Sequence, residues 1–445
     1  MTARLKLWYA NHKNVISMTK FTLVSFILLF IVWLVDVKYP FVKKHIPEFF
    51  LLSSDLSNSF LSSLSGVFLT VTTFTFSTIL TVMTTHMSNL ASSIIQKFIN
   101  KRHVLSLIGI FIGGFFYTVL SLFILGDIKF EQKVLAGSLG IVYAMASMIH
   151  FMIFIMVVIR YIKASNVIQD IYDEGIELVK EEAKRRKEST RMFDKGKGEL
   201  IQIYSNQTGY FYGVDYAGLF NILKDFKGTI VIKRQIGEFI SKGIYLADLS
   251  LVGDRQLSSL DKEEKVEYLK SMSECFLFND EKNEDLDYHN EITNLVEIAT
   301  TALSSGVKSP NDAISCIEKV SNMIGQLFST ENHYIIMEQN ENIQIIYTSY
   351  SIEQEMYLAF NQLIPKAKAD PSVYNAILEG ISLIRMIADD SVRGEVENFF
   401  DYAYDIFHKG IDNNYDKKLI ENIRSNFYFS KNTEADEEAM REEEE

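Results

Sequence analysis

The chain has 445 residues, enough for two or three domains. Hydrophobic residues make up 48% of it, and 57 Asp and Glu against 44 Lys and Arg give a net charge of −13. The acidic residues concentrate after Asp170, which argues against nucleic acid as a partner because phosphate binding needs a basic surface. The two cysteines, Cys275 and Cys316, cannot form a disulfide framework and fit a reducing compartment.

Four apolar stretches predict membrane-spanning helices over residues 20–38, 62–86, 104–125 and 134–163, because about 20 apolar residues cross a bilayer. We interpret the first as a helix rather than a signal peptide, since no small-residue cleavage site follows it. The short segments that flank these stretches carry nine Lys and Arg residues on the side of the two termini and five on the other side. This bias predicts a multi-pass protein of the plasma (inner) membrane with both termini in the cytoplasm.

The second stretch is rich in hydroxyl groups. At about 100° per residue, eight of its small and hydroxyl residues fall within a strip roughly 80° wide along the helix: Ser63, Gly66, Thr70, Thr73, Ser77, Thr81, Thr84 and Ser88. The strip supplies pore-lining candidates, and two neighbouring aromatic residues, Phe74 and Phe76, are candidates for an apolar constriction. The pore-lining candidates are Thr70, Thr73, Ser77, Thr81, Thr84 and Ser88. The alternative is a hydroxyl seam that closes a four-helix bundle and transports nothing.

Small residues recur at every fourth position in the third and fourth stretches, which predicts close helix packing in lipid, either within one subunit or between subunits. These packing candidates are Gly109, Gly113, Ala136, Gly140 and Ala144. His150 lies near the middle of the fourth stretch and is a functional candidate as an intramembrane ionisable residue. A neutral imidazole hydrogen-bonded between helices is the simpler interpretation.

No proline interrupts the pattern after the fourth stretch, so we expect that helix to continue through a helical connector, residues 164–199. The connector ends in a basic cluster, which we interpret as cations favoured at a helix C-terminus; a lipid-binding patch is the alternative. The cluster comprises Lys184, Arg185, Arg186, Lys187 and Arg191.

Beyond the connector, β-branched and aromatic runs predict a small β module over residues 200–248. Its segment 236–246 resembles the turn of biotinyl and lipoyl half-barrels, without the lysine that accepts a lipoyl group. Residues 249–430 predict a helical domain, in which Ser309 before Pro310 is typical of a helix N-cap. Residues 431–445 are mostly acidic, and this composition predicts a disordered tail. The fold class is therefore a mainly α integral membrane protein with a cytoplasmic β module and helical bundle.

Motifs of catalysis are absent from the sequence: it contains no P-loop, no G-x-G-x-x-G after a strand, no H-E-x-x-H and no G-x-S-x-G. Its eight histidines are scattered, with no pair at metal-ligand spacing. We therefore expect no catalytic residues, no metal, no cofactor and no enzymatic activity.

Several short motifs occur in a characteristic order. They are Phe76-Ser77, Gly109-x-Phe111-x-Gly113-x-x-Phe116-Tyr117, Gly209-Tyr210 with Asp215, Gly237-Glu238-Phe239 up to Gly243, and Leu295-Val296-x-Ile298-Ala299-x-x-Ala302-Leu303-Ser304. In these the chain resembles the predicted membrane proteins catalogued as domain of unknown function 2254, from about Leu64 to Ala388. Where that family reads Pro-Gly-Ile-Asn-Asp-Pro, this chain has Ser305, Lys308 and Ser309 within the loop, so no ligand role is carried over. The resemblance implies an architecture and no activity.

From these patterns we expect a homo-oligomeric channel or permeation path in the lipid bilayer. The second helix would line the path, and the cytoplasmic domain would assemble or gate it. The alternative is a membrane-anchored scaffold or sensor whose cytoplasmic domain binds a protein partner or ligand, without transport.

Overall fold

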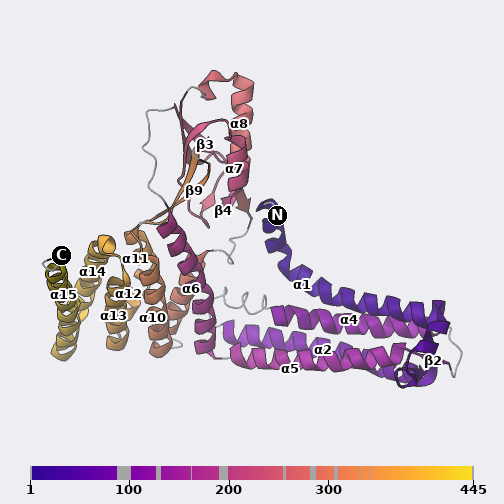
Figure 1. Cartoon of the computed structure of the whole chain (residues 1–445). Helices are drawn as coiled ribbons and strands as arrows, with labels where there is room; N and C mark the ends of the chain where they lie inside the picture. The colour runs from indigo at the N-terminus through magenta and orange to yellow at the C-terminus, as the bar shows by residue number, and fades with distance from the viewer. Residues whose placement is uncertain are drawn as a thin grey trace. The chain divides into compact units, whose positions relative to one another are not determined.

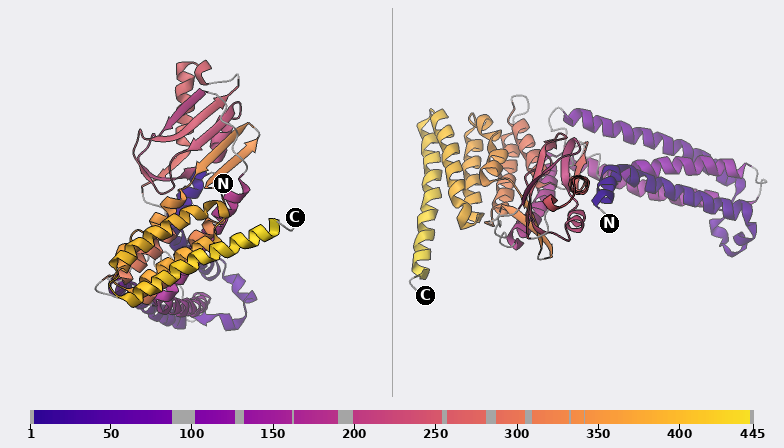
Figure 2. Two further views of the ribbon diagram at one scale, coloured as in Figure 1. Left: turned by 90° about the vertical axis from the view of Figure 1, so that its left-hand side faces the viewer. Right: turned by 90° about the horizontal axis from the view of Figure 1, so that it is seen from above.

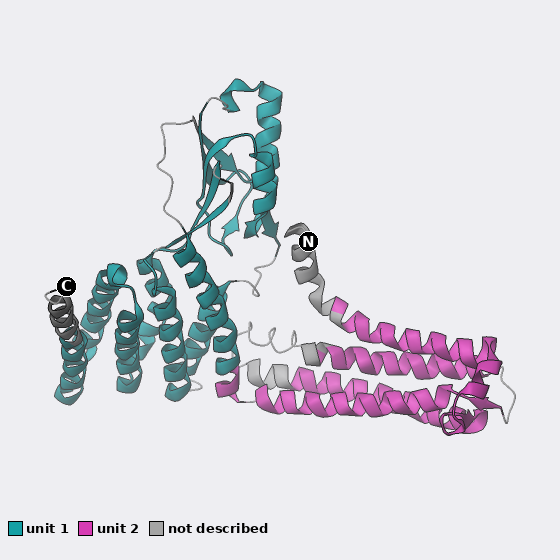
Figure 3. Ribbon diagram, in the orientation of Figure 1, with its two compact units in different colours: residues 1–4, 168–445 teal, residues 5–167 magenta. Residues whose placement is uncertain are grey.

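The computed structural model describes residues 3–87, 102–126, 132–161, 163–189, 199–253, 257–280, 287–304, 309–331, 333–340 and 342–442. The chain divides into two compact units (Figure 3). The first consists of residues 5–167, which we call the membrane unit, and the second of residues 1–4 with 168–445, which we call the soluble unit.

The membrane unit contains four long helices (Figure 1): α1 (Ala3–Val32), α2 (Ser54–Met87), α4 (Arg102–Leu125) and α5 (Ala136–Tyr161). Stretches long and apolar enough to cross a membrane lie at Met18–Lys38, Ser54–Thr81, Ser106–Leu125 and Ala136–Tyr161. The first begins in α1 and ends in a π-helix, Trp33–Lys38, that follows α1 directly. These spans confirm the four helices predicted from hydropathy. The second begins at Ser54 rather than at residue 62, because its first turns are polar and carry little hydropathy signal.

Helix α4 lies at the centre of this bundle. Half of its apolar window is buried, whereas 17% or less is buried in the other three helices. It packs on α2 and α5 around a core that includes Phe68, Leu107, Phe111 and Phe154. A second apolar cluster, around Leu61 and Tyr117, lies toward the other end of the bundle. The remaining faces of α1 and α5 are exposed and mostly apolar, as expected of surfaces that contact lipid, whereas the exposed face of α2 also carries hydroxyl groups.

The helix predicted to run unbroken from the membrane into the connector is interrupted. Helix α5 ends at Tyr161, and α6 (Ala164–Glu188) begins three residues later. The Asn166 side-chain amide donates to the Arg160 carbonyl at 3.0 Å, which satisfies an acceptor that an unbroken helix would have used itself. The prediction of one continuous helix was therefore wrong, and a short polar side chain explains the break.

Two sheets form the β part of the soluble unit. The larger has the order β3 (Glu199–Tyr204), β7 (Tyr245–Val252), β5 (Lys227–Ile232), β10 (Ile343–Thr348) and β9 (Tyr334–Asn340), and only the β5–β10 pair is parallel. The smaller has β4 (Gly209–Val214) between β6 (Phe239–Ile240) and β8 (Phe276–Asn279). Both sheets and the helices α7 (Tyr216–Ile222) and α8 (Lys262–Glu274) contribute to one apolar core.

The β module is larger than the predicted residues 200–248. Strands β8, β9 and β10 come from the segment that we expected to be helical, and β10 lies in the middle of the large sheet, paired with β5. Within the segment 236–246, Gly237 and Gly243 lie in two tight turns on either side of β6, and both have positive φ, at 83° and 85°.

The rest of the soluble unit is helical. After α6 come α9 (Tyr288–Ala302), α10 (Pro310–Leu327), α11 (Ile352–Phe360), α12 (Leu363–Ala367), α13 (Pro371–Ile387), α14 (Arg393–Gly410) and α15 (Asn414–Glu442). Helices α10, α13, α14 and α15 stand in a row (Figures 1 and 2). Ser309 is the N-cap of α10 as predicted, although its hydroxyl bonds Asp312 rather than the backbone. Residues 431–442, predicted to be disordered, continue α15, because Glu, Ala and Met favour helix.

Candidate functional sites

The hydroxyl strip of α2 lies on the surface of the membrane unit. Thr70, Thr73, Ser77 and Thr81 are all exposed. Four buried positions of the same helix, Leu61, Phe68, Thr75 and Ile79, lie on its opposite side at about 100° per residue. The strip is therefore not a seam that closes the bundle within one chain, which was the alternative interpretation of the sequence.

The strip threonines bond their own helix. The hydroxyls of Thr70, Thr73 and Thr81 donate to the carbonyls of residues four positions earlier, at 2.8, 3.0 and 2.9 Å. The two constriction candidates, Phe74 and Phe76, flank the strip. Their side chains are 59% and 57% exposed, respectively. The side chain of Thr84 and all of Ser88 lie outside the described residues.

A cavity of about 450 Å³ lies between three helices of the membrane unit. Residues of α1, α2 and α4 line it, among them Met18, Thr73, Phe76 and Ile108. The Thr75 side chain also lines it, is 1% exposed, and has a hydroxyl without a hydrogen-bond partner among the described residues. The cavity therefore has mostly apolar walls, and the Thr75 hydroxyl oxygen is buried behind them.

The small-residue positions are sites of close contact inside the bundle. A Cβ atom on Gly109 would lie 2.6 Å from the Met18 carbonyl oxygen of α1, and one on Gly113 would lie 2.3 Å from the Ser25 hydroxyl. A Cβ atom on Gly140 would lie 2.8 Å from Leu61 of α2. Of the two alanines, Ala136 is buried and Ala144 is partly buried against the core. These contacts place the packing seam within one chain.

Two polar contacts in the membrane unit were not predicted. Tyr143 of α5 donates to the Ile110 carbonyl of α4 at 2.7 Å, and its oxygen lies 2.9 Å from the buried Ser25 hydroxyl of α1. The buried Asp36 carboxylate accepts from the Leu135 and Ala136 backbone amides, at 2.9 to 3.0 Å, and so caps α5.

Lys43 completes the Asp36 site. Its ammonium lies 3.0 Å from the carboxylate and also donates to the Lys133 carbonyl at 2.8 Å. The pair therefore fixes the segment between α1 and α2 to the start of α5. His150, in contrast, bonds only its own helix in the contacts that we observe, through Nδ1 and the Ala146 carbonyl at 2.9 Å.

The soluble unit contains a buried charge cluster centred on His289, at the start of α9. His289 Nδ1 donates to Asp287 at 2.8 Å, and Nε2 donates to both Glu355 oxygens at 3.0 Å. The neighbouring Tyr288 hydroxyl donates to Glu355 at 2.6 Å. Glu355, on α11, is 0% exposed, so every charge near it must be compensated inside the protein.

Arg186 connects α6 to this cluster. Its guanidinium donates to Glu182 at 3.0 Å, to the Tyr288 hydroxyl at 3.0 Å and to the Ser349 hydroxyl at 2.7 Å. Arg186 is 2% exposed, whereas Lys184, Arg185 and Lys187 are exposed. Arg185, Arg186 and Lys187 lie in the last turn of α6, as the helix-end interpretation expects, but Arg186 is in addition buried in the charge cluster. Arg191 lies outside the described residues.

The cluster keeps His289 charged at neutral pH. Burial lowers the pKa of His289, but the charges of Glu355 and Asp287 outweigh this effect and raise that pKa to about 10. Burial and the Glu355 charge raise the pKa of the Tyr288 hydroxyl well above its ordinary value. With both ring nitrogens donating, His289 acts as a structural cation and not as a base.

Sequence patterns contained a signal for this cluster. Arg186 continues the buried face of α6 after Val179 and Ala183, and His289 is in phase with the buried Ile292 of α9. The partners, however, come from α9, from the residue after β10 and from α11, which no local pattern brings together.

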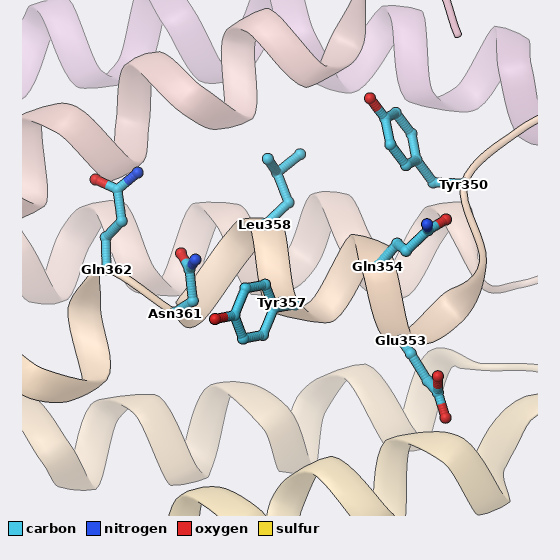
Figure 4. A pocket seen from close by; sticks show the side chains of 7 residues that line it. All are labelled: Tyr350, Glu353, Gln354, Tyr357, Leu358, Asn361 and Gln362. Atoms are coloured by element: carbon cyan, nitrogen blue, oxygen red, sulfur yellow. The ribbon is translucent and has the colours of Figure 1, made fainter. Parts of the chain in front are cut away.

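A shallow pocket lies on α11 next to the charge cluster (Figure 4). Its volume is about 450 Å³, and its lining includes Tyr350, Glu353, Tyr357 and Asn361. The Tyr350 ring packs edge-on against the His289 ring, with centroids 4.6 Å apart, so one end of the pocket borders the cluster. In the part of the chain that the structure describes, no group of three or more His, Cys, Asp or Glu side chains is placed to hold a metal ion.

Together these observations define a membrane protein with four candidate spanning helices and a soluble unit of sheets and helices. The chain matches the predicted membrane proteins DUF2254 over residues 13–382 and belongs to this family. It has no significant similarity to any curated protein or to any solved structure.

Proposed function

We propose that the protein forms a homo-oligomeric permeation path in the plasma membrane, with the α2 strip as its wall. The position of the strip supports this proposal best: Thr70, Thr73, Ser77 and Thr81 lie opposite the buried face of α2. A helix face rich in oxygen atoms gains nothing from lipid, but it solvates water and ions or packs against another copy of itself.

Other parts of the chain take supporting roles in this proposal. Phe74 and Phe76 flank the strip and supply an apolar constriction. Both termini and the soluble unit lie in the cytoplasm, as the distribution of basic residues favours. The soluble unit assembles or gates the path, and α6 carries motion because Arg186 anchors it in the charge cluster.

Currents across planar bilayers test the path directly. Purified protein is recorded beside Thr81→Ile, which replaces a strip hydroxyl by an alkyl group, and Met148→Ile, which changes the outward face of α5, where Met148 is 66% exposed. We expect unitary currents that Thr81→Ile alters and Met148→Ile leaves unchanged. Silent bilayers over a range of voltage and tension, from folded oligomeric protein, would overturn the proposal.

Cysteine crosslinking tests the arrangement of subunits. Ser77→Cys and Thr81→Cys are expected to crosslink between copies in the membrane, because the path places the strips of neighbouring subunits face to face. Met148→Cys, on the exposed side of α5, serves as the control and is expected not to crosslink. Equal crosslinking at all three positions would contradict the arrangement.

A membrane-anchored sensor is the second candidate. The α11 pocket favours it, because Tyr350 joins that pocket to the charge cluster that holds α6. In that case the soluble unit binds a ligand or protein partner and nothing crosses the membrane, and an apolar replacement of the strip leaves function intact. Neither candidate includes catalysis.

A further inference from the structure

The chain leaves α1 through a widened helical turn. The π-helix Trp33–Lys38 is closed by the Tyr39 amide, which donates to the Leu34 carbonyl five residues earlier at 2.7 Å. In an α-helix, side chains five positions apart point about 140° away from each other, whereas the wider turn of a π-helix brings them close to the same side. Lys38 therefore lies over the Trp33 ring, with its ammonium 5.4 Å from the ring centroid.

A row of aromatic rings, bridged by Lys38, continues from α1 into the segment that follows it. Phe30 of α1 stacks on Trp33, with centroids 5.8 Å apart. The Lys38 ammonium also lies 5.6 Å from the Tyr39 centroid, and the Tyr39 ring packs edge-on against Phe41 at 5.9 Å. All four rings are exposed, Phe41 the most at 63%. We call Trp33, Lys38, Tyr39 and Phe41 the aromatic cluster.

The aromatic cluster lies where the membrane spans end. The first span ends at Lys38 and the second begins at Ser54, and both limits are helix ends, because a 3₁₀-helix follows the one and a short strand precedes the other. Asp36, on the buried side of the same π-helix, caps α5 at Ala136, where the fourth span begins. The cluster is therefore on the outer side of the bundle, at the boundary between hydrocarbon and headgroups, where Trp, Tyr and Lys side chains are favoured.

Lipid is the partner that this surface fits. Phe30 lies within the first span and is exposed, so the row of rings starts on the wall that contacts hydrocarbon and continues from it without a gap. Indole and phenol rings are stabilised at this boundary, because their apolar body lies among acyl chains while their N–H or O–H reaches polar groups. An ammonium group held over two such rings lies at the level of the lipid phosphates.

We propose that the aromatic cluster anchors the membrane unit in the leaflet opposite the N-terminus. The rings of Trp33, Tyr39 and Phe41 lie among the upper parts of the acyl chains, and the Lys38 ammonium binds the phosphate of one phospholipid. Anionic phospholipids are favoured at this position over zwitterionic ones, because Lys38 is a cation. The segment after α1 is thus a membrane-interface element and not an aqueous loop, whether or not the protein forms a permeation path.

Tryptophan fluorescence tests the depth of the rings. The chain has two tryptophans, Trp8 and Trp33, so Trp8→Phe leaves Trp33 as the only probe. Phe41→Trp, in a chain with both native tryptophans replaced by Phe, reports on the far end of the row. The full-length proteins are reconstituted into vesicles of phosphatidylcholine brominated near either the ester or the methyl end of its chains. We expect bromine near the ester to quench both probes at least twofold more strongly than bromine near the methyl end.

Iodide, present in the water on both sides of the vesicle membrane, is the opposing quencher. Tyr415→Trp in the same background is the matched control, because Tyr415 is a 77% exposed position of the soluble unit. We expect iodide to quench Phe41→Trp at least fivefold less than Tyr415→Trp. Equal quenching by iodide would overturn the proposal. Shielding of Phe41→Trp from iodide and bromine alike would also overturn it, because protein would then cover the rings.

A comparison of lipids tests the contact of Lys38. In Trp8→Phe, quenching of Trp33 by brominated phosphatidylglycerol is compared with quenching by brominated phosphatidylcholine, each diluted into unbrominated phosphatidylcholine. We expect at least a twofold preference for phosphatidylglycerol, which Lys38→Gln abolishes and Lys409→Gln, at an exposed position of the soluble unit, leaves unchanged. Because Lys38 is exposed, its replacement does not disturb the core of the bundle. The same preference in Lys38→Gln, or none in the parent protein, would contradict the phosphate contact.

Discussion

His289 shows how a buried imidazole is held as a cation. Two carboxylates contact its two nitrogens, and Arg186 supplies the second positive charge through Tyr288. A buried charge whose partner is removed is costly, so the residues of the cluster depend on one another. The cluster ties α6, α9 and α11 together at one point.

Glu355→Ala is expected to lower the free energy of unfolding of the soluble unit by about 3–5 kcal/mol, because it leaves His289 and Tyr288 without their shared acceptor. Thermal unfolding of the purified full-length protein measures this loss. Glu353→Ala is the matched control, since Glu353 is on the same helix and exposed. Equal effects of the two substitutions would mean that the cluster does not stabilise the fold.

The pH dependence of stability reports on His289. Its pKa is raised in the folded state to about 10 from an ordinary 6.5, so its contribution is complete below about pH 6.5 and is lost as the pH rises through 10. We expect the wild-type melting temperature to fall between pH 7 and pH 10, and to fall less in Glu355→Gln, which removes one of the two charges that raise this pKa. Parallel pH profiles for the two proteins would contradict this assignment.

At the scale of elements, close approach of helices explains the glycines of α4. Met18 on α1 has its backbone against Gly109, where any side chain would collide with a carbonyl that cannot move independently of its helix. Gly66 on α2 offers a contrast, because nothing lies within 4 Å of the position of its missing Cβ.

Gly109→Ala and Gly66→Ala therefore form a matched pair. We expect Gly109→Ala to lower the melting temperature of the detergent-purified protein by several degrees, since α1 must move away from α4. Gly66→Ala should leave the melting temperature unchanged or raise it, because Ala favours helix by about 1 kcal/mol over Gly. A destabilising Gly66→Ala with a neutral Gly109→Ala would reverse our account of the packing.

Asp36 acts across elements as a cap. Asp36→Ala removes the acceptor of two α5 amides and leaves Lys43 without its carboxylate, so we expect a loss of about 1–2 kcal/mol and faster proteolysis between α1 and α2. Limited proteolysis and thermal unfolding measure the two effects. Asp55→Ala, at an exposed position in the first turn of α2, is the control and is expected to change neither.

For the whole molecule, the accuracy of sequence-based prediction depended on whether the signal was local. The four spans were predicted because hydropathy is summed over neighbouring residues. Strand β10 was not predicted because its partner, β5, is far away in the sequence. The helix break near Asn166 was not predicted because it involves a hydrogen bond from a single side chain, which leaves no periodic signal. The strip residues were found from their spacing, but their outward orientation needed the packing of α2 on α4 and α5.

The orientation of the chain is testable with single cysteines. The native Cys275 and Cys316 are 7% and 0% exposed, so they should react little. On intact cells, a membrane-impermeant maleimide is expected to label Phe49→Cys, at an 87% exposed position between α1 and α2, and not Lys409→Cys on α14. Lysis should make Lys409→Cys reactive. The reverse pattern would place the termini outside the cell.

The hydroxyl hydrogens of Thr70, Thr73 and Thr81 point to α2 backbone carbonyls, to which they donate hydrogen bonds. Their hydroxyl oxygens therefore present lone pairs, and no proton, to whatever lies beside the helix. A path lined by such oxygens attracts positive charge and does not offer hydrogen bonds to anions. We accordingly expect reversal potentials, measured in a salt gradient, to show cations passing in preference to chloride.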